Sequence, residues 1–585
     1  MSSIAFGSVG WGSIFGRRRG VVLALLLALF GVALVVLTGL SPVDAQANPF
    51  WSQLGADIDG EAADDEFGRS VAISGDGNTV IVGGPRNGDN GVHSGHARVY
   101  RLNGTAWTQL GTDLNGDNRS DEFGRSVAIS ADGNTVIIGA PFNDVNGVNS
   151  GHARAFRFNG TDWAQLGADI NGEASNDQSA FSLSMSADGN TVIIGTNSND
   201  ARVMRFNGTT WAQLGADIDG EASDDFNGFA VAMSADGNTV IIGAPFNDAN
   251  GSNSGHARIF RFNGTTWTQL GVAIDGEATN NVFGVAVAMS TDGNSVVIGA
   301  RSSDSIGLNA GTAQVYRFDG SVWVQVGADI DGEAIGDAFG TAVAMSADGN
   351  TVIIGAPQND GTATTAGHAR VYRLTVGMWV QLGADLDGEA LADASGSAVA
   401  ISGDGNTVII GAIDNDGGGI NGGHARVYRG LSGAQLCNGR VVTVNLGAGH
   451  TPTSGDDVIL GTAGADAIVA SGGNDTICGQ DGNDTINAGP GDDWVDAGAG
   501  DDTVFGLDGN DTVFGRSGDD VIVTGNDDDV ASGDNGDDVI NGGAGNDSLD
   551  GGAGNDELFG QSGNCLLYTS PSPRDATLSR MPSSA

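Results

Sequence analysis

Aspartate recurs at every ninth position near the C-terminal end of the chain, a spacing of carboxylates suited to binding metal ions. The series is Asp457, Asp466, Asp475, Asp484, Asp493, Asp502, Asp511, Asp520, Asp529, Asp538, Asp547 and Asp556. Glycine stands two residues before each aspartate of the series except Asp529, where Asp527 takes its place. An apolar residue stands two residues after each aspartate. Ca²⁺ takes about six to eight hard oxygen ligands, and glycine-rich turns let backbone carbonyls join the carboxylates. We therefore predict Ca²⁺ as the cofactor, bound by Asp466, Asp475, Asp484, Asp493, Asp502, Asp511, Asp520, Asp538, Asp547 and Asp556. Asp529 is left out because Asp527 replaces its glycine.

The charge balance fits a cation-binding segment. The chain has 72 acidic residues against 25 Lys and Arg, and its formal net charge is −47. Residues 456–557 hold 25 acidic residues and one basic residue, Arg516. Nucleic acid is excluded as a partner because its phosphates would be repelled. An acidic disordered linker is the alternative, but a disordered linker has no reason to keep a nine-residue register.

The nonapeptide unit resembles the RTX family of calcium-binding repeats. Residues 542–549 read Gly-Gly-Ala-Gly-Asn-Asp-Ser-Leu, a complete G-G-x-G-x-D-x-U unit, and residues 551–558 form another. The resemblance implies a parallel β-roll over residues 456–564, in which two nonapeptides make one coil. Aspartates eighteen residues apart would then stack about 4.8 Å apart. One edge would carry Asp484, Asp502 and Asp520, and the other Asp475, Asp493 and Asp511. Because stacked carboxylates repel one another, we expect the roll to fold only when Ca²⁺ binds.

A different repeat fills the chain before this segment. The signature W-x-Q-[LV]-G begins at Trp51, Trp107, Trp163, Trp211, Trp267, Trp323 and Trp379, at intervals of 56 residues apart from one of 48. Each unit contains three further Val/Ile-rich segments, such as 126–130, 135–140 and 153–158, separated by Asp-Gly and Asn-Gly turns. We predict one four-stranded antiparallel blade per unit. The predicted fold is therefore all-β, a seven-bladed β-propeller over residues 48–430 followed by the β-roll.

The two ends of the array indicate how the ring closes. The chain begins the array with an unpartnered tryptophan segment, Trp51–Leu54, and ends it after residues 427–429 without another. Pairing of Trp51–Leu54 with the segment Ala425–Tyr428 would complete the seventh blade. Residues 431–455 are then predicted to be a linker between the propeller and the roll.

The tryptophan units resemble FG-GAP repeats, the blade unit of integrin-α-like propellers. Phe-Gly begins at Phe67, Phe123, Phe283 and Phe339, and Gly-Ala-Pro begins at Gly139, Gly243 and Gly355. Three copies depart from Phe-Gly and read Ser179-Ala180, Asn227-Gly228 and Ser395-Gly396. The calcium loop of that family is reduced in this chain to Asp-Gly-Asn, so we do not expect calcium at that loop.

Two further repeated features carry side chains capable of chemistry. Histidine occupies one repeat position, at His96, His152, His256, His368 and His424, and Thr312 replaces it in one copy. We interpret these histidines as hydrogen-bonding groups at a strand start, with a metal site as the alternative. An Asp-x-Asp-Gly-Glu loop begins at Asp57, Asp217 and Asp329. We interpret it as a solvated turn between blades, with cation binding as the alternative. No catalytic set interrupts the repeats, so we expect a protein that is not an enzyme.

The N-terminal residues are typical of an export signal. Three arginines at 17–19 precede an apolar run over residues 20–40, and small residues within 45–47 offer a cleavage site. We predict a signal peptide over residues 1–47, with an uncleaved membrane anchor as the alternative. The expected location is therefore extracellular or at the cell surface.

The C-terminal residues 565–585 share neither the composition nor the period of the nonapeptides. They resemble translated sequencing-adapter sequence, and we expect them to have no regular structure. Among the three cysteines, Cys437 and Cys478 could pair in an oxidising compartment, but their spacing alone leaves this open.

Together these features favour a secreted or surface-attached calcium-binding protein. Its propeller would be a recognition or adhesion platform for an unidentified extracellular ligand, either a glycan or a matrix or surface protein. Two alternatives stay open: an accessory region of a larger secreted enzyme whose catalytic part is missing, and a structural envelope or matrix protein. Membrane contact is expected only through an uncleaved N-terminal segment.

Overall fold

The structure is a computed structural model that describes residues 50–375, 377–430, 436–438, 440–448, 450–563 and 565–568. The predicted signal peptide or anchor, residues 1–47, lies outside the described residues. The regular structure of the described residues is β-strand, apart from one 3₁₀ turn, η1 (Leu446–Ala448). In the described part of the chain no helix is long and apolar enough to cross a membrane. The predicted all-β fold, a seven-bladed propeller followed by a parallel β-roll, is confirmed.

One blade shows how the repeat folds. Four antiparallel strands lie in the order β8 (Ser126–Ile129), β9 (Thr135–Ala140), β10 (His152–Phe158) and β11 (Trp163–Gln165). A fifth strand, β12 (Ile170–Asn171), pairs with β10 beside β11. The sequence analysis assigned residues at this position of the repeat, within the Asp-x-Asp-Gly-Glu loops, to a turn. They form a strand because the Ile170 side chain is buried, which holds the backbone against the edge of β10.

The other blades repeat this strand order. One blade contains β3 (Ser70–Ile73), β4 (Thr79–Gly84), β5 (His96–Asn103), β6 (Ala106–Gln109) and β7 (Leu114–Asn115). The blade of the shortened repeat contains β13 (Ser182–Met185), β14 (Thr191–Gly195), β15 (Asp200–Phe206), β16 (Trp211–Gln213) and β17 (Ile218–Asp219). The next contains β18 (Ala230–Met233), β19 (Thr239–Ala244), β20 (His256–Phe262), β21 (Trp267–Gln269) and β22 (Ile274–Asp275). It is followed by β23 (Ala286–Met289), β24 (Ser295–Ala300), β25 (Thr312–Phe318), β26 (Trp323–Gln325) and β27 (Ile330–Asp331). The sixth along the chain contains β28 (Ala342–Met345), β29 (Thr351–Ala356), β30 (His368–Thr375), β31 (Met378–Gln381) and β32 (Leu386–Asp387).

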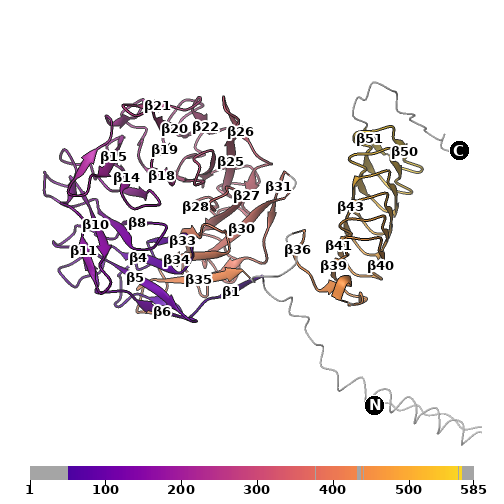
Figure 1. Ribbon diagram of the computed structural model, residues 1–585, viewed down its shortest axis with the longest axis horizontal. Helices are drawn as coiled ribbons and strands as arrows, with labels where there is room; N and C mark the ends of the chain where they lie inside the picture. The colour runs from indigo at the N-terminus through magenta and orange to yellow at the C-terminus, as the bar shows by residue number, and fades with distance from the viewer. Residues whose placement is uncertain are drawn as a thin grey trace, which may run out of the picture. The chain divides into compact units, whose positions relative to one another are not determined.

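The last blade closes the ring with residues from both ends of the array. It contains β33 (Ser395–Ile401), β34 (Thr407–Ala412) and β35 (His424–Gly430), together with β1 (Trp51–Gln53) and β2 (Ile58–Asp59). Trp51 lies opposite Gly430, and Gln53 lies opposite Tyr428. The predicted closure is therefore confirmed, and Figure 1 shows β1 beside β35 in the ring of blades.

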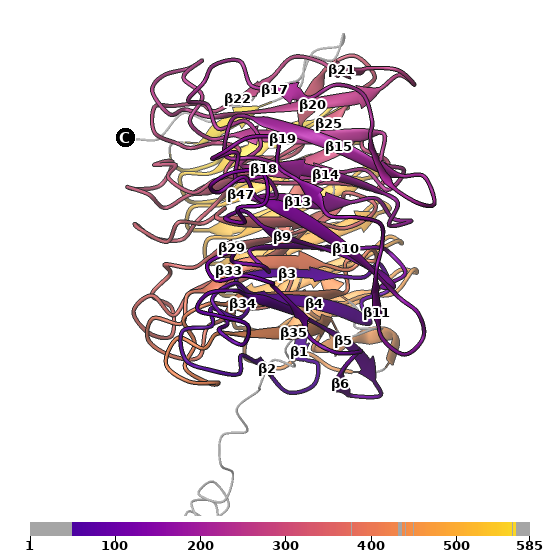
Figure 2. The same cartoon turned by 90° about the vertical axis from the view of Figure 1, so that its left-hand side faces the viewer.

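The second strand of each blade forms the core of the propeller. Every residue of β9 and of β19 is buried, as the consecutive apolar residues of these strands predict for a sheet covered on both faces. Their side chains pack into hydrophobic clusters that join neighbouring blades, such as Ile241 with Phe283 and Val296. Figure 2 shows the blades from the side, with loops at both ends of the strands.

A closed ring of backbone hydrogen bonds joins the turns after the first strands of the blades. The amide of Gly75 donates to the carbonyl of Ala131, at 2.9 Å, and that of Gly403 donates to Gly75, at 2.9 Å. The same bond links each intervening pair, namely Ala131 to Ala187, Ala187 to Ala235, Ala235 to Thr291, Thr291 to Ala347 and Ala347 to Gly403. Each turn thus satisfies a backbone donor of its neighbour, which fixes the spacing of the blades.

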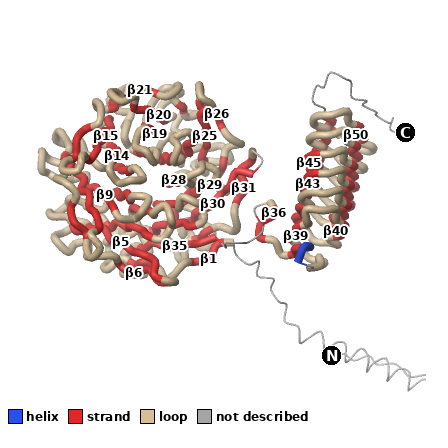
Figure 3. The backbone as a smooth tube through the Cα atoms, in the orientation of Figure 1, coloured by secondary structure: helices blue, strands red, loops and turns tan. Residues whose placement is uncertain are grey.

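The roll consists of two parallel sheets whose short strands alternate along the chain (Figure 3). One sheet has the order β38 (Val444–Asn445), β39 (Val458–Leu460), β41 (Thr476–Cys478), β43 (Trp494–Ala499), β45 (Thr512–Ser517), β47 (Val530–Ser532), β49 (Ser548–Asp550) and β51 (Leu566–Tyr568). The other has the order β40 (Ala467–Val469), β42 (Thr485–Pro490), β44 (Thr503–Asp508), β46 (Val521–Asn526), β48 (Val539–Asn541) and β50 (Glu557–Phe559). Strands eighteen residues apart are paired, so two nonapeptides make one coil, as predicted.

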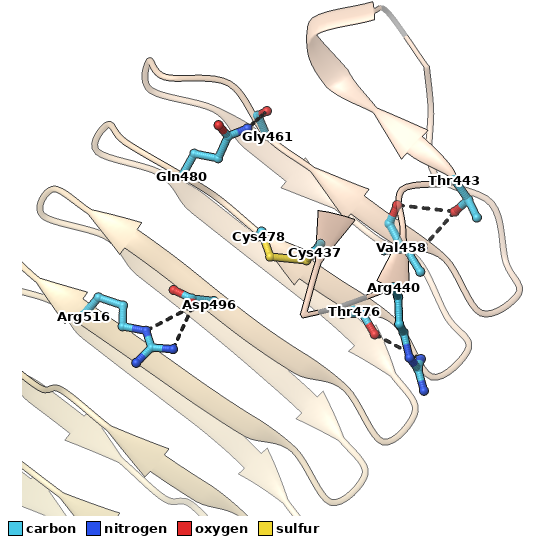
Figure 4. Close-up of a disulfide and its surroundings, with 10 residues drawn as sticks. All are labelled: Cys437, Arg440, Thr443, Val458, Gly461, Thr476, Cys478, Gln480, Asp496 and Arg516. Carbon is cyan, nitrogen blue, oxygen red and sulfur yellow. Dashed lines mark hydrogen bonds and ion pairs between the residues drawn. A yellow bond between two sulfur atoms is a disulfide. The ribbon is translucent and has the colours of Figure 1, made fainter. Parts of the chain in front are cut away.

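The roll begins within the predicted linker. Strand β38 pairs with β39, and Val444 packs on the apolar core of the roll. Before it, the hairpin of β36 (Leu436–Cys437) and β37 (Arg440–Val441) is joined to β41 by a disulfide between Cys437 and Cys478 (Figure 4). The predicted boundary between linker and roll at residue 455 was therefore wrong. The sequence did not reveal this because residues 431–455 lack the nine-residue period. Strand β38 is itself the first strand of the sheet, and β36 contacts β39 and β41.

The roll also extends past its predicted end at residue 564. Strand β51 pairs with β49, so the expectation of no regular structure is wrong for Leu566–Tyr568. Leu567 falls nine residues after Leu558, at the position of the buried apolar side chains, and packs against the core. Residues 569–585 lie outside the described residues.

Candidate calcium ladders

The buried apolar side chains of the roll position the aspartates. Ile486, Val504 and Ile522 are fully buried and stack along one sheet, while Val495 and Val513 do the same along the other. Each aspartate precedes such a residue by two positions. The core register therefore places aspartates eighteen residues apart directly above one another, in two columns.

From Asp475 to Asp556, one carboxylate oxygen of each aspartate of the series binds the backbone of the preceding coil. Asp466 differs, because its Oδ2 accepts the amide of Thr462 at 2.6 Å. The amide of Asp484 donates to Oδ1 of Asp502, and the amide of Asp502 donates to Oδ1 of Asp520, both at 2.8 Å. In the second column the amide of Asp475 donates to Oδ1 of Asp493 at 2.7 Å, and that of Asp493 to Oδ1 of Asp511 at 2.9 Å. These bonds fix the carboxylates and leave Oδ2 as the oxygen available to a ligand.

The Oδ2 atoms are buried, and among the described residues they have no hydrogen-bond partner. This applies to Asp475, Asp484, Asp493, Asp502, Asp511, Asp520, Asp529 and Asp538. Asp502 and Asp511, for example, are each 1% exposed. A buried carboxylate oxygen without a partner is costly, because it has lost its water and gained nothing in exchange. A cation would supply the missing interaction.

The turns leave room beside several of these oxygens. A Cβ added at Gly515 would come within 2.3 Å of Oδ2 of Asp520, and one at Gly479 within 2.5 Å of Oδ2 of Asp484. Glycine thus keeps the approach to the carboxylate open and lets backbone carbonyls lie nearby. The donor set of carboxylate and carbonyl oxygens fits Ca²⁺, which prefers hard oxygen ligands.

Burial raises the pKa of the ladder aspartates, and neighbouring aspartates raise it further. The pKa of Asp493, Asp511 and Asp520 is raised to about 7, although a backbone amide bonded to each carboxylate opposes the shift. The pKa of Asp475, Asp502, Asp529 and Asp538 is raised to about 6 for the same reasons. The ladders therefore disfavour negative charge unless a cation compensates it.

The structure places all ten predicted ligands in the two columns and adds Asp529. Asp529 is 1% exposed, and its Oδ1 accepts the amide of Asp511 at 2.9 Å. The sequence analysis excluded Asp529 because Asp527 replaces a glycine, but Asp527 adopts the positive φ of the turn, 77°, and Asp529 keeps the same place in the column as its neighbours. The pKa of Asp529 is raised like that of its neighbours.

A second, exposed ladder precedes the first and was missed by the sequence analysis. The residue before each aspartate of the series is Asp or Asn in every repeat except at Ala465. The amide of Asn510 donates to Oδ1 of Asp492 at 2.8 Å, and that of Asp537 donates to Oδ1 of Asp519 at 2.8 Å. The Asp or Asn that precedes nearly every aspartate of the series was the signal available in the sequence.

The Asp-Gly-Asn turns of the propeller bind their own residues. Oδ1 of Asp132 accepts the hydroxyl of Ser130 at 2.6 Å and the amide of Asn134 at 2.9 Å. Burial raises the pKa of Asp132, but these hydrogen bonds outweigh it and lower the pKa overall. This carboxylate is satisfied within the turn, unlike those of the roll.

The repeated histidines do not have the hydrogen bonds that the sequence analysis assigned to them. Within the described residues, His96, His152, His256 and His368 have no hydrogen-bond partner on either ring nitrogen, and His424 has none on Nδ1. The Asp-x-Asp-Gly-Glu loops lie beside them: Asp57 is 3.7 Å from Nδ1 of His424, and Glu61 forms an ion pair with Arg98. These loops are therefore more than solvated turns.

Comparison with known families agrees with both repeat types. The RTX calcium-binding nonapeptide repeat matches within residues 452–564, in overlapping segments 452–486, 479–513, 496–531, 505–540 and 532–564. The FG-GAP repeat matches residues 57–100, 115–156, 211–260, 269–316 and 329–372. The two unmatched blades are those with Ser179 and Ser395 in place of phenylalanine. No curated protein matches the chain. The chain thus carries FG-GAP repeats, folded as a seven-bladed propeller, followed by RTX calcium-binding repeats folded as a β-roll.

Proposed function

We propose that this is an extracellular calcium-binding protein whose roll folds on Ca²⁺ outside the cell and whose propeller is a recognition and adhesion platform. The observation that carries the calcium part is the pair of columns of buried, unpartnered Oδ2 atoms among the described residues. Calcium sites of extracellular modules have dissociation constants of about 10⁻⁴ to 10⁻³ M. Cytosolic Ca²⁺ would leave such sites empty, so the roll would gain its structure after export.

Polar pockets between neighbouring blades support the recognition part. They lie on the hairpin face, which carries the Asp-Gly-Asn turns and the turns between third and fourth strands. One pocket of about 740 Å³ is lined by Arg205, Asp236, Arg261, Phe262 and Asn294, among others. Four further pockets of about 510 to 700 Å³ in other blades repeat the arginine, aspartate and asparagine, and two of the four also contain a phenylalanine. Guanidinium, carboxylate and amide groups beside an aromatic ring suit the hydroxyls and apolar faces of sugars.

A glycan is therefore the favoured ligand class, and a matrix or surface protein is the second. The uniform repetition of the pockets supports a multivalent binder, in which several weak contacts add up to firm attachment. It does not favour a catalytic site, which would be expected to break the symmetry of the repeats. An accessory role in a larger secreted enzyme, or a structural role in an envelope, remains the alternative.

The test is a binding screen of the full chain against immobilised glycans and matrix proteins, in saturating Ca²⁺. We expect binding to glycans, competed by the soluble sugar. Replacement of Arg205, Arg261 and Arg317 together by alanine should weaken it, because these residues line or border successive pockets. Exposed Arg119 on the other face is the matched control. Binding to matrix proteins alone, or unchanged binding by the triple variant, would contradict the glycan proposal.

A further inference from the structure

Five buried histidines lie on the propeller face opposite the pockets. This crossover face is formed by the long loops between second and third strands and by the Asp-x-Asp-Gly-Glu loops. His96 is fully buried, and His368 and His424 are each 1% exposed. In the described part of the chain, Nδ1 of all five histidines lacks a hydrogen-bond partner. A buried imidazole without a partner indicates that something outside the chain completes its environment.

Three of these histidines face carboxylates from two blades. The clusters are Glu61, Asp89, His96 and Asp113; Glu333, His368 and Asp385; and Asp57, Glu389 and His424. In each cluster the atoms that could bind a metal lie within 4.8 Å of one another. The aspartate follows its histidine by seventeen residues and the glutamate precedes it by thirty-five, with the ring closure supplying Asp57 for His424. One geometry therefore recurs at three blade junctions.

The distances fit a shared ion better than a direct hydrogen bond. Nδ1 of His368 lies 3.7 Å from Oδ2 of Asp385, and Nδ1 of His424 lies 3.7 Å from Oδ2 of Asp57. These separations are too long for hydrogen bonds. Two ligands bound to one Zn²⁺ at about 2.1 Å, with angles of about 110 to 125°, lie about 3.4 to 3.7 Å apart. A bridging water with hydrogen bonds of about 2.8 Å would usually place them farther apart, at about 4.4 Å.

The charges leave room for a divalent cation at the strongest cluster. Arg98 forms ion pairs with Glu61 and Asp113, which neutralises one of the three carboxylates that surround His96. Two negative charges remain, with Asp89 among them. At His368 the pairing of Arg370 with Glu333 and Asp385 leaves one negative charge. We therefore expect the cluster of His96 to bind most tightly.

The histidines are in the protonation state that metals require. Burial lowers the pKa of His96, His368 and His424, in the last case to about 4, although nearby aspartates oppose the shift. The imidazoles are therefore neutral at physiological pH, and at His96 and His368 the Nδ1 that has no partner among the described residues is free to present a lone pair to the carboxylates. At His424, Nε2 accepts a hydrogen bond of 3.4 Å from Nε of Arg426, so a metal at Nδ1 would have to displace this contact. A mixed set of imidazole and carboxylate ligands suits Zn²⁺ and similar transition ions, whereas Ca²⁺ prefers oxygen alone.

We propose that the crossover face of the propeller holds up to three Zn²⁺-type transition-metal sites, centred on His96, His368 and His424. They are distinct in chemistry from the calcium ladders of the roll. Each would join the loops of two neighbouring blades.

The test is equilibrium dialysis of the full chain against Zn²⁺ in saturating Ca²⁺, which keeps the ladders of the roll occupied. We expect up to three Zn²⁺ per chain. The variant His96→Thr should lose one of them, and the triple variant H96T/H368T/H424T should lose all. Threonine is a tolerated replacement, because Thr312 occupies the same repeat position and donates its hydroxyl to the carbonyl of Ile330 at 3.1 Å.

His256 provides the matched control. It lies at the same repeat position and is 1% exposed, and Oδ1 of Asp275 lies 3.8 Å from its Nδ1. Ala273 replaces the aspartate that follows by seventeen residues, however, and among the described residues His256 belongs to no cluster of three potential ligands. The variant His256→Thr should therefore keep the full Zn²⁺ count. X-ray absorption of the zinc-loaded protein should show nitrogen ligation that disappears in the triple variant. Unchanged zinc binding by the triple variant, or no zinc bound by the folded wild type, would overturn the proposal. If the triple variant fails to fold by circular dichroism, the three single variants decide it.

Discussion

The indole Nε1 of Trp51 donates a hydrogen bond of 2.7 Å to the carbonyl of Leu382, 331 residues away in the chain. The other tryptophans of the repeat make the same bond to the preceding blade, as Trp107 does to Leu54 at 2.6 Å and Trp211 to Leu166 at 2.7 Å. Each tryptophan therefore locks one blade to the next. The bond of Trp51 is special because it joins the two ends of the array.

Replacing Trp51 by alanine should open the ring. Trp51 is 5% exposed and packs against Phe50, so the loss should destabilise the propeller by about 3 to 5 kcal/mol. Strand β1 is three residues long, and without Trp51 it should detach from β35 and leave an unpaired edge. Limited proteolysis should cut near Trp51, and size-exclusion chromatography should show association through the exposed edge.

Trp211→Ala is the matched control for this variant. It removes the same indole hydrogen bond. Its strand, β16, however, follows β15 and precedes β17 in the sequence, so all strands of that blade come from one continuous stretch of chain. We expect a loss of stability without opening of the ring. Equal proteolysis at both sites would contradict a special role for Trp51 in closure.

Removal of calcium should unfold the roll and leave the propeller folded. Full-length protein in chelator should lose amide-exchange protection over residues 444–563, and added Ca²⁺ should restore it with a midpoint of about 10⁻⁴ to 10⁻³ M. Replacing Asp502 and Asp520 together by alanine should raise that midpoint, since both carboxylates belong to one column. Mg²⁺ should substitute poorly because it requires a tighter octahedral shell.

Asp508→Ala is the control for the ladder variants. Asp508 lies in the same roll but is exposed, and its carboxylate accepts the side-chain amide of Asn526 at 2.6 Å. We expect its calcium midpoint to match that of the wild type. A roll that is equally protected with and without chelator would show that folding and calcium binding are independent.

The period of a repeat is a local property, and for this reason the sequence predicts the ladders and the ring well. The nine-residue register places Asp484 above Asp502 once the core of Ile486 and Val504 is stacked. Whether a buried polar side chain lacks a hydrogen-bond partner is harder to predict from the sequence. The surroundings of His96 depend on Glu61 and Asp113 from different loops, so its missing hydrogen bonds within the described residues become evident only when the blades are assembled.

Acid should stabilise the calcium-free roll. The pKa of Asp493, Asp511 and Asp520 is raised to about 7, above the value of about 4 of an unfolded chain, by burial and by neighbouring aspartates. The folded state therefore binds protons more tightly than the unfolded state, and its stability rises as pH falls from about 7 to about 4. Hydrogen exchange in chelator at pH 5 and pH 8 should show more protection at pH 5.

Calcium binding should have the opposite pH dependence and weaken as the pH falls. Protons compete with Ca²⁺ for the same carboxylates, so the calcium midpoint should rise as pH falls below about 7. Titrations at pH 5.5 and pH 8 measure the difference. A midpoint that does not change with pH would mean that the aspartates with raised pKa are not the calcium ligands.

Breaking the disulfide should weaken the first coils of the roll. The bond between Cys437 and Cys478 spans 41 residues of sequence, and in the chain-entropy model a loop of this size is worth about 4 kcal/mol. The double variant Cys437→Ser/Cys478→Ser should therefore raise the calcium midpoint and reduce amide protection first in β39 and β41. Cys565→Ser is the control, because Cys565 lies outside the disulfide, beside the last strand. Equal effects of the two changes would show that the tether does not stabilise the start of the roll. A loss of protection confined to the last coils would contradict the prediction in the same way.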